Sequence, residues 1–232
     1  MKLGLLGDIH GNSAALRAVL KSAGHQGVDA LCVTGDLVGY YYHPDEVLEL
    51  LENWETYRVR GNHEDMLTQV RAEPAKLEAF ERRYGSGLRL ALELLTDKQL
   101  QALSDLPANL DFRFDDCAVL LAHGAPWDAD HYIYPDAEPA EFARFASYAA
   151  DLAVLGHTHY RMQRTAGRCL IVNPGSVGQP RDRIPGAAWA LFDTETRICR
   201  HFTEPYDITA VVAEAQSRDP QHSYLQEVLT RV

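Results

Sequence analysis

Aspartate and histidine, with one asparagine, recur beside glycine in five segments of this chain. The segments are GDIHG at 7–11, GD at 35–36, GNHE at 61–64, HG at 123–124 and GHTH at 156–159. Each follows a short apolar stretch of the kind that forms a buried strand, and glycine permits tight turns and close approach of a ligand. One such segment alone is more often a turn or a helix cap than a ligand site. Five in succession point to one shared site.

The side chains of these segments form a nitrogen and oxygen ligand set without sulfur. They are Asp8, His10, Asp36, Asn62, His123, His157 and His159. This set suits manganese, iron, zinc or nickel better than magnesium or copper(I), and we expect Mn²⁺ first. Seven ligands are too many for one ordinary site, but a carboxylate that bridges two ions about 3.5–4 Å apart gives each ion enough ligands. The sequence therefore predicts two divalent metal ions.

The first third of the chain alternates between strand and helix. Strands are predicted at 2–7, 29–36 and 57–64, and helices between them at 13–23 and 44–54. This order favours a parallel sheet with right-handed crossovers. Because open α/β sheets bind ligands outside the carboxyl ends of their strands, the five segments should meet in one crevice.

The rest of the chain predicts a helical insertion and a second sheet. Residues 65–106 have only helical patterns and form an insertion or cap, whereas 109–114, 117–122 and 152–159 are predicted strands and 139–149 a helix. Four short segments at 160–166, 168–176, 187–193 and 197–203 predict an antiparallel second sheet, and 207–231 one or two helices. Two sheets packed face to face with helices outside make a four-layer α/β (α+β) sandwich, expected as a single domain of 1–232.

Composition and charge exclude several classes of function. The 232 residues are 46% hydrophobic and 24% charged, as in globular domains, and the apolar runs are too short to cross a membrane. The net charge of −11 disfavours nucleic acid as a partner. The first residues lack the apolar core of a signal peptide, so a cytoplasmic location is expected by default.

The ordered motifs carry a family resemblance. D-x-H, G-D, G-N-H-[ED], H-G and G-H-x-H, together covering Lys2 to about Phe202, resemble the calcineurin-like metallophosphoesterases. The runs GDLVGYYYHP at 35–44 and NPGSVGQPRD at 173–182 resemble the small prokaryotic phosphodiesterase and diadenosine tetraphosphatase-like branch. The resemblance implies a β-sandwich of two mixed sheets. It also implies the metal ligands, which are Asp8, His10, Asp36 and His159 for one ion and Asp36, Asn62, His123 and His157 for the other, with Asp36 as the bridge.

The implied activity is hydrolysis of a phosphodiester or phosphoanhydride bond in a small, nucleotide-like substrate by a hydroxide that bridges two metals. His63, off the metals, is expected to be the leaving-group acid, and Asn62 to contact a phosphoryl oxygen as well. A phosphomonoesterase and a Ser/Thr protein phosphatase are alternatives of the same class. Protein phosphatases have GDxVDRG where this chain has GDLVGY at 35–40, so the acid that orients the histidine and the neighbouring arginine are missing. A non-catalytic binding scaffold is the alternative of another class, and the complete ligand set favours catalysis.

Several residues near the motifs keep open roles. The acidic partner of His63 is left open, with Glu64 and Asp45 as candidates. Arg181 is a candidate for a bidentate phosphate contact, and Tyr40 for stacking on the substrate or for packing its loop. Arg183 is a second candidate for the phosphate contact, and the other candidates to line the crevice are Tyr41, Tyr42, His43 and His131.

Overall fold

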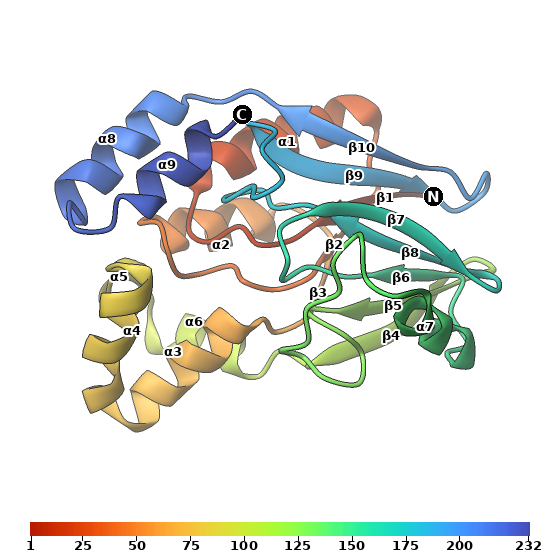
Figure 1. Cartoon of the computed structure of the whole chain (residues 1–232), viewed down its shortest axis with the longest axis horizontal. Helices are drawn as coiled ribbons and strands as arrows, with labels where there is room; N and C mark the ends of the chain where they lie inside the picture. Colours follow the sequence, from red (N-terminus) through yellow and green to blue (C-terminus); the bar gives the residue numbers. More distant parts are fainter.

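A computed structural model describes all residues from Met1 to Val232 and contains two five-stranded sheets packed face to face (Figure 1). Sheet A has the order β10-β9-β1-β2-β3, built from β1 (Lys2–Leu6), β2 (Ala30–Val33), β3 (Thr56–Arg58), β9 (Ala187–Asp193) and β10 (Cys199–Glu204). Sheet B has the order β4-β5-β6-β8-β7, built from β4 (Asn109–Phe114), β5 (Cys117–Ala122), β6 (Leu152–Val154), β7 (Arg161–Ala166) and β8 (Cys169–Pro174). Each sheet mixes parallel and antiparallel pairs, so the predicted α/β sandwich of two mixed sheets is confirmed.

Helices cover the outer faces and gather at one end of the sandwich. Sheet A is covered by α1 (Ser13–Gln26) and α2 (Pro44–Glu52), and sheet B by α7 (Pro139–Ala143) and the 3-10 turn η2 (Arg144–Ser147). The predicted helical segment contains α3 (Asn62–Ala72), η1 (Pro74–Lys76), α4 (Leu77–Tyr84), α5 (Gly87–Leu94) and α6 (Asp97–Ser104). In Figure 1 this segment and the C-terminal helices α8 (Ile208–Arg218) and α9 (Tyr224–Thr230) lie at the same end. None of these helices combines the length and apolar composition that a bilayer crossing requires.

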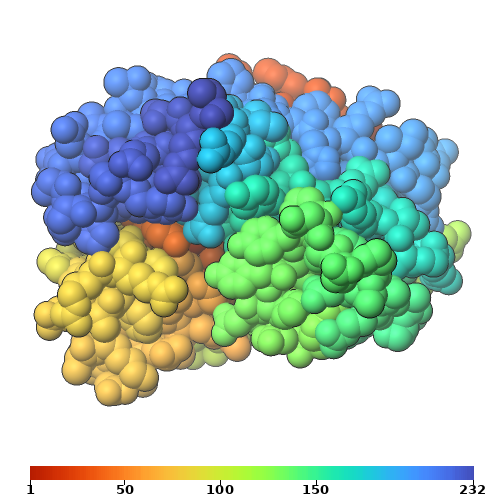
Figure 2. Space-filling model, in the orientation of Figure 1, coloured from red at the N-terminus to blue at the C-terminus, as the bar shows by residue number.

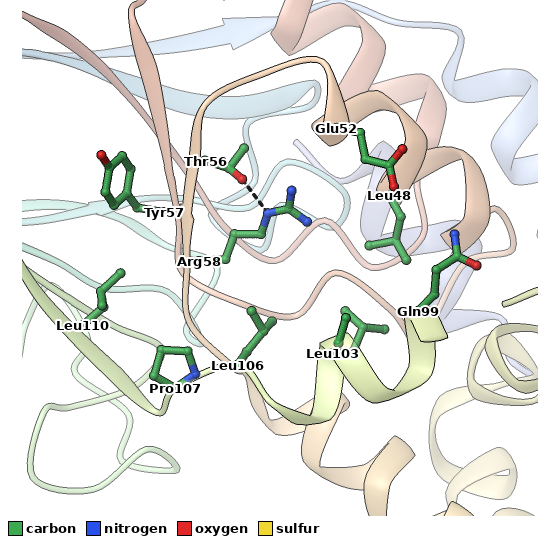
Figure 3. A pocket seen from close by; sticks show the side chains of 11 residues that line it. Leu48, Glu52, Thr56, Tyr57, Arg58, Gln99, Leu103, Leu106, Pro107 and Leu110 are labelled. Atoms are coloured by element: carbon green, nitrogen blue, oxygen red, sulfur yellow. Dashed lines mark hydrogen bonds between the residues drawn. The ribbon is translucent and has the colours of Figure 1, made fainter. Parts of the chain in front are cut away.

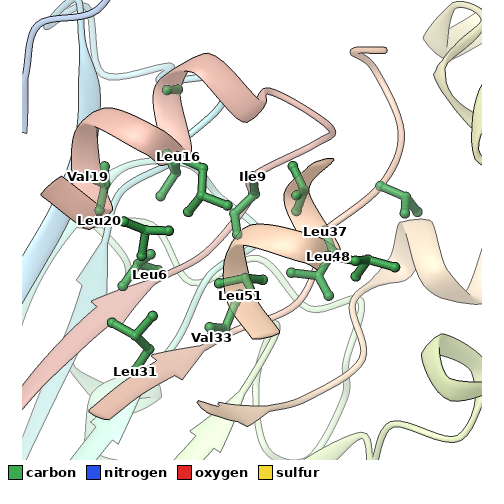
Figure 4. Close-up of a cluster of buried hydrophobic side chains, with 14 of the residues drawn as sticks. Leu6, Ile9, Leu16, Val19, Leu20, Leu31, Val33, Leu37, Leu48 and Leu51 are labelled. Carbon is green, nitrogen blue, oxygen red and sulfur yellow. The ribbon is translucent and has the colours of Figure 1, made fainter. Parts of the chain in front are cut away.

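Alternate residues of one strand belong to two different cores. In β1, Leu3 and Leu5 lie between the sheets, whereas Leu6 belongs to the cluster under the outer helices. Figure 4 shows this outer cluster, in which side chains of β1 and β2 meet Leu16 of α1 and Leu51 of α2. Because successive side chains of a strand point to opposite faces, a strand buried on both faces has a continuous apolar sequence. Because both faces of β1 and β2 are packed, the ends of these strands are held in place. The first two motifs follow these ends.

The expected antiparallel second sheet is wrong. The four segments form two antiparallel pairs, β7–β8 and β9–β10, which join different sheets. β8 pairs with β6 in sheet B, and β9 pairs with β1 in sheet A. Both pairs have the same local pattern of short strands and turns, so the choice of sheet depends on contacts distant in sequence.

The strand predicted over 57–64 is also too long. β3 ends at Arg58, and α3 already begins at Asn62. The Glu64 carboxylate accepts a hydrogen bond from the Gly61 backbone N–H (2.9 Å), which satisfies one of the free donors at the start of the helix. Asn62 and His63 thus occupy the first turn of a helix. The strands predicted over 29–36 and 152–159 likewise stop at Val33 and Val154, leaving their motifs in loops.

Candidate metal centre

The five motifs lie together at the carboxyl ends of strands from both sheets. Asp8 and His10 follow β1, Asp36 follows β2, His123 follows β5, and His157 and His159 follow β6. Asn62 opens α3. Six of these side chains are buried, and Asn62 is partly exposed. The structure therefore brings all seven predicted ligand residues into one place.

One half of the group is a compact set of four residues. Asp8, His10, Asp36 and His159 each offer a ligand atom, and these atoms lie within 4.8 Å of one another. His159 Nε2 is 3.5 Å from Asp8 Oδ1, and the other oxygen of Asp8 is buried without a hydrogen-bond partner. A buried Asp/His metal-binding group is thus present.

The other half gathers around His123. Its Nε2 is 2.9 Å from Asn62 Oδ1 and 3.0 Å from His157 Nδ1. Asp36 Oδ2 lies between the two halves, 3.6 Å from His10 Nε2 and 3.5 Å from His123 Nε2. Asp36 Oδ2 is therefore close to a histidine of each half.

Backbone carbonyls fix the tautomers of three of the histidines. The Nδ1 atoms of His10, His123 and His159 face the carbonyl oxygens of Val38, Thr34 and Gln179 at 3.2, 2.8 and 2.7 Å. A carbonyl only accepts, so each Nδ1 carries the proton and each Nε2 presents a lone pair to the centre.

His157 has the opposite orientation. Its Nε2 faces the Asp130 carbonyl at 3.2 Å, so its lone pair is on Nδ1. Two pairs of nitrogens therefore meet lone pair to lone pair, His10 with His159 at 3.2 Å and His123 with His157 at 3.0 Å. Neither contact can be a hydrogen bond between neutral rings. Both become favourable when a cation lies beside the pair and accepts a lone pair from each nitrogen.

Burial adds an electrostatic argument for cations. It raises the pKa of the Asp8 carboxyl to about 7 and also raises the pKa of Asp36, which lies near Glu64 and Asp8. Burial lowers the pKa of His10 and His123, and that of His157 to about 4. The imidazoles are therefore neutral, and the carboxyl groups are hard to ionise. A divalent ion would bind the neutral nitrogens and stabilise the ionised carboxylates.

The backbone at the centre is strained. Nine non-glycine residues have positive φ angles, and six of them belong to this region. They are Asp8, His10, Asp36, Tyr40, His157 and His159. Such conformations cost roughly 1–3 kcal/mol each and persist only where the surroundings enforce them. The strain turns ligand side chains inward at the points where the strands end.

Glu64 is one of the groups that hold the loops. Its buried carboxylate accepts hydrogen bonds from the backbone N–H groups of Asp36 and Leu37, both at 2.8 Å, and of Val38 at 3.2 Å. With the Gly61 contact, one carboxylate ties the second motif to the third. Glu64 is therefore engaged with the backbone and is not the partner of His63.

The segment after the last motif holds the first loop. The Ser176 hydroxyl donates to the Asp8 carbonyl at 2.7 Å, and the Gly178 N–H donates to the same oxygen at 3.0 Å. A Cβ added to Gly178 would lie 1.9 Å from the Ile9 carbonyl oxygen, so only glycine fits there. Ser176 and Gly178 of the NPGSVG run thus hold the backbone of Asp8 in place.

His63 lies beside the ligands. Its ring is buried 4.7 Å from that of His10, between centroids, and its Nδ1 has no hydrogen-bond partner. Neither Glu64 nor Asp45 fills the role of its acidic partner. A Cβ on Gly39 would lie 2.0 Å from this Nδ1, so Gly39 leaves room for the ring. Burial lowers the pKa of His63 to about 3, and the ring is neutral in the free protein.

A crevice of about 280 Å³ opens over the centre. Figure 2 shows it as a hollow between the yellow α4–α5 region, the blue C-terminal helices and the green segment near residue 130. Arg181 and Tyr40 line it, as predicted, and the Arg181 guanidinium donates to the Tyr40 hydroxyl at 3.1 Å. Four further lining residues, Arg83, Tyr84, Tyr132 and Tyr224, belong to no motif, and the sequence contained no signal for them.

The other candidates for the crevice lie elsewhere. Tyr41 and Tyr42 are buried against the C-terminal helices, where they pack the loop. His43 and His131 pair with Glu214 and Glu141 at 2.8 and 3.0 Å. Arg183 is exposed and does not line the crevice. Of the three consecutive tyrosines, Tyr40 alone lines the crevice.

A second cavity, of about 390 Å³, shares no residue with the crevice. It lies at the edge of sheet A among α2, β3 and α6 and is mostly apolar. Figure 3 shows Arg58 extending into it between side chains of α2 and α6. The Arg58 Nε donates to the Thr56 hydroxyl at 2.7 Å, and burial lowers the pKa of the guanidinium.

Residues 1–197 match the family profile of the calcineurin-like phosphoesterase superfamily domain, and the chain belongs to this superfamily. An uncharacterized protein of Methanocaldococcus jannaschii is 26% identical over 223 residues, which cover 89% of this chain and 88% of that one. A metallophosphoesterase from Sphaerobacter thermophilus has a TM-score of 0.80 and 27% identity, covering 100% of this chain and 99% of its own. Hypothetical protein PH1004 from Pyrococcus horikoshii OT3 has a TM-score of 0.87 and 21% identity, covering 99% and 98%.

Structural neighbours also include an archaeal phosphodiesterase and a candidate diadenosine tetraphosphatase, with TM-scores of 0.51 and 0.58. At 19% and 18% identity, over 88% of this chain, they show the fold alone. The family resemblance predicted from the five motifs is thus confirmed. With the buried Asp/His group, family membership makes the protein a metal-dependent phosphoesterase by class.

Proposed function

We propose that this protein hydrolyses a phosphodiester or phosphoanhydride bond in a nucleotide-like substrate, with two divalent ions, Mn²⁺ first among them. The observation that carries the proposal is the pair of facing lone-pair contacts, His10 with His159 and His123 with His157. Asp36 Oδ2 lies between these pairs. Each pair of histidines has lone pairs without a hydrogen-bond donor, and the Asp36 oxygen is near both pairs. This arrangement supports two ions better than one.

The donor set fits these ions by its chemistry. Asp8, His10, Asp36 and His159 would hold one ion, and Asp36, Asn62, His123 and His157 the other. Bound there, divalent ions lower the pKa of water and neutralise charge on a phosphoryl group. Asp8 Oδ2, buried without a partner, is the kind of orphaned oxygen that a cation satisfies.

The remaining crevice residues bind and orient the substrate. Asn62 is partly exposed at the crevice, and its amide can donate to a phosphoryl oxygen. Arg181 offers a guanidinium to the phosphate, and Tyr40 holds that guanidinium through its hydroxyl. Phosphoryl transfer asks mainly for such positioning and charge stabilisation.

His63 is assigned to the leaving group. It lines the crevice, its backbone N–H donates to Asp36 Oδ1 at 2.9 Å, and no contact engages its Nδ1. The neutral ring can donate an N–H hydrogen bond to the departing oxygen, and the negative charge of a bound phosphate raises the pKa of the ring, which favours donation of a proton. Its orientation comes from the rings of His10, Tyr40 and Tyr84 instead of from an acid.

A metal-reconstitution panel tests the proposal. The protein is stripped with a chelator, reloaded separately with Mn²⁺, Fe²⁺, Zn²⁺, Ni²⁺ or Mg²⁺, and assayed on bis-p-nitrophenyl phosphate, p-nitrophenyl phosphate, a dinucleoside polyphosphate, a cyclic nucleotide and a phosphopeptide. We expect activity to return with Mn²⁺ and to favour the diester or anhydride. Faster turnover of the monoester or the phosphopeptide would identify the protein as a phosphatase. Full metal loading without turnover of any substrate would identify a binding scaffold.

A further inference from the structure

We propose that Arg83 is a second anion contact in the crevice, so that the substrate carries two negatively charged groups, one at the metal centre and one between Arg83 and Arg181. This inference rests on the proposed phosphoesterase function and narrows its substrate class. A phosphoanhydride, with two adjacent phosphoryl groups, meets the requirement, whereas a simple phosphodiester does not.

The end of α4 is built into the crevice. Gly85 ends the helix with φ +81°, and the next residue, Ser86, donates from its N–H and its hydroxyl to Asp219 Oδ2 at 3.0 and 2.8 Å. A Cβ on Gly87 would lie 2.6 Å from the Tyr40 backbone nitrogen. The chain just after Arg83 is therefore fixed on one side to buried Asp219 and on the other to the Tyr40 loop.

This junction carries Tyr84 and Arg83 to the metal centre. The Tyr84 ring lies 5.2 Å from that of His63, between centroids. The Arg83 guanidinium lies over the Tyr84 ring, 5.0 Å from its centroid, and lines the same crevice as Asp36 and His159. The helical segment thus brings a cation to the opening of the site.

The neighbouring arginine has a different environment. Both arginines are exposed, but Arg82 pairs with Glu78, whereas Arg83 forms no ion pair and lines the crevice. Arg181 likewise has no carboxylate partner, and its Nε is buried without any hydrogen-bond partner. A buried donor left unsatisfied costs roughly 1–3 kcal/mol. Two guanidinium groups without acidic partners in one small crevice are a binding site for an anion beyond the one at the metals.

The size of the crevice restricts the substrate further. Its volume of about 280 Å³ lies just below the usual range for ligand pockets, which is about 300–1,000 Å³. Two phosphoryl groups fit such a space. The net charge of −11 makes local cations all the more necessary for a doubly charged substrate.

Calorimetric titration of the metal-loaded protein with inorganic phosphate and with pyrophosphate, supplied as its non-hydrolysable methylene analogue, tests the inference. The measured quantity is the ratio of the two affinities, taken at one metal concentration so that chelation by pyrophosphate is the same for every variant. We expect Arg83→Gln to lower the preference for pyrophosphate about tenfold, the effect of losing one charge-assisted hydrogen bond. Arg82→Gln is the matched control and should keep the wild-type ratio. Melting curves show whether both variants are folded.

The outcomes separate this inference from the proposed function. An unchanged ratio in Arg83→Gln, or an equal fall in Arg82→Gln, overturns the role of Arg83 even if the enzyme hydrolyses diesters well. A tenfold fall only in Arg83→Gln supports it even if no substrate of the activity panel is turned over, because binding is measured without catalysis.

Discussion

The metal crevice and the apolar cavity at the edge of sheet A differ in how they are built. The apolar cavity is the larger, at about 390 against 280 Å³, and its walls come from regular elements, α2, β3 and α6. The crevice is smaller and polar, and five of the seven candidate ligands at its centre are loop residues with left-handed backbone. Volume and apolar lining therefore do not indicate where the chemistry occurs. Strain, orphaned polar atoms and facing lone pairs do.

The two regions are connected through one short segment. Arg58 of β3 lines the apolar cavity, and Asn62, four residues later, lines the crevice. Between them the Arg60 backbone N–H donates to the Pro107 carbonyl at 2.8 Å, which anchors the segment to the end of α6. If only the crevice is functional, substitutions in the crevice should change turnover or metal content. Substitutions in the apolar cavity should change only stability.

Asp36→Asn should have the largest effect. It removes the shared negative oxygen from both halves of the centre, and each ion is worth several kcal/mol of charge stabilisation. We expect turnover to fall at least about 10⁴-fold on every substrate, together with metal content measured by elemental analysis.

Metal removal provides the reference for Asp36→Asn. Chelation should lower the melting temperature of the wild-type protein, because an ion at about 1,000 times its Kd stabilises by roughly 4 kcal/mol. In Asp36→Asn, adding metal should raise the melting temperature much less than it does in the wild-type protein. Asp111→Asn, at an exposed position in β4, is the control and should retain it. Full metal content in Asp36→Asn would contradict the shared oxygen.

His63→Ala should come next, and it should separate chemistry from metal binding. We expect both metals to be retained and turnover to fall about 10²–10⁴-fold, the usual contribution of acid catalysis. The loss should be smaller for nitrophenolate, which departs without a proton, than for an alcohol leaving group. Loss of metal, or an equal defect with both leaving groups, would remove His63 from this role.

The sequence predicted which side chains lie together, because most of them directly follow an apolar strand and each has a glycine nearby. It failed where the outcome depends on distant contacts. The two antiparallel pairs look alike locally but join different sheets, and Asn62 begins a helix because the Glu64 carboxylate caps it. Arg83 and Tyr224 reach the crevice from separate helices with no motif around them. The end of α4, which carries Arg83, is held by the contact of Ser86 with the distant Asp219.

Glu64→Gln should act on stability before it acts on chemistry. The carboxylate accepts four backbone N–H groups, and an amide would turn donors toward some of them. We expect a loss of about 2–4 kcal/mol, seen as a melting temperature lower by roughly 5–15 °C. Glu78→Gln, at an exposed position in α4, should change stability by no more than about 0.5 kcal/mol. A stable Glu64→Gln with the leaving-group dependence of His63→Ala would instead make Glu64 the partner of His63.

Arg58→Met should have the smallest effect, and it is the sharpest test of the comparison. The guanidinium is partly desolvated in an apolar cavity, with Thr56 as its hydrogen-bond acceptor, and an unpaired charge in such surroundings costs free energy. Methionine keeps the apolar stem without the charge, so stability should change by no more than about 1 kcal/mol. We expect kcat/KM on bis-p-nitrophenyl phosphate to stay within about twofold, because the apolar cavity and the crevice share no lining residue and sites without shared contacts act nearly independently. A tenfold fall in kcat/KM with unchanged melting would show that β3 transmits the state of the apolar cavity to the metal centre, and the two regions would then be one functional unit.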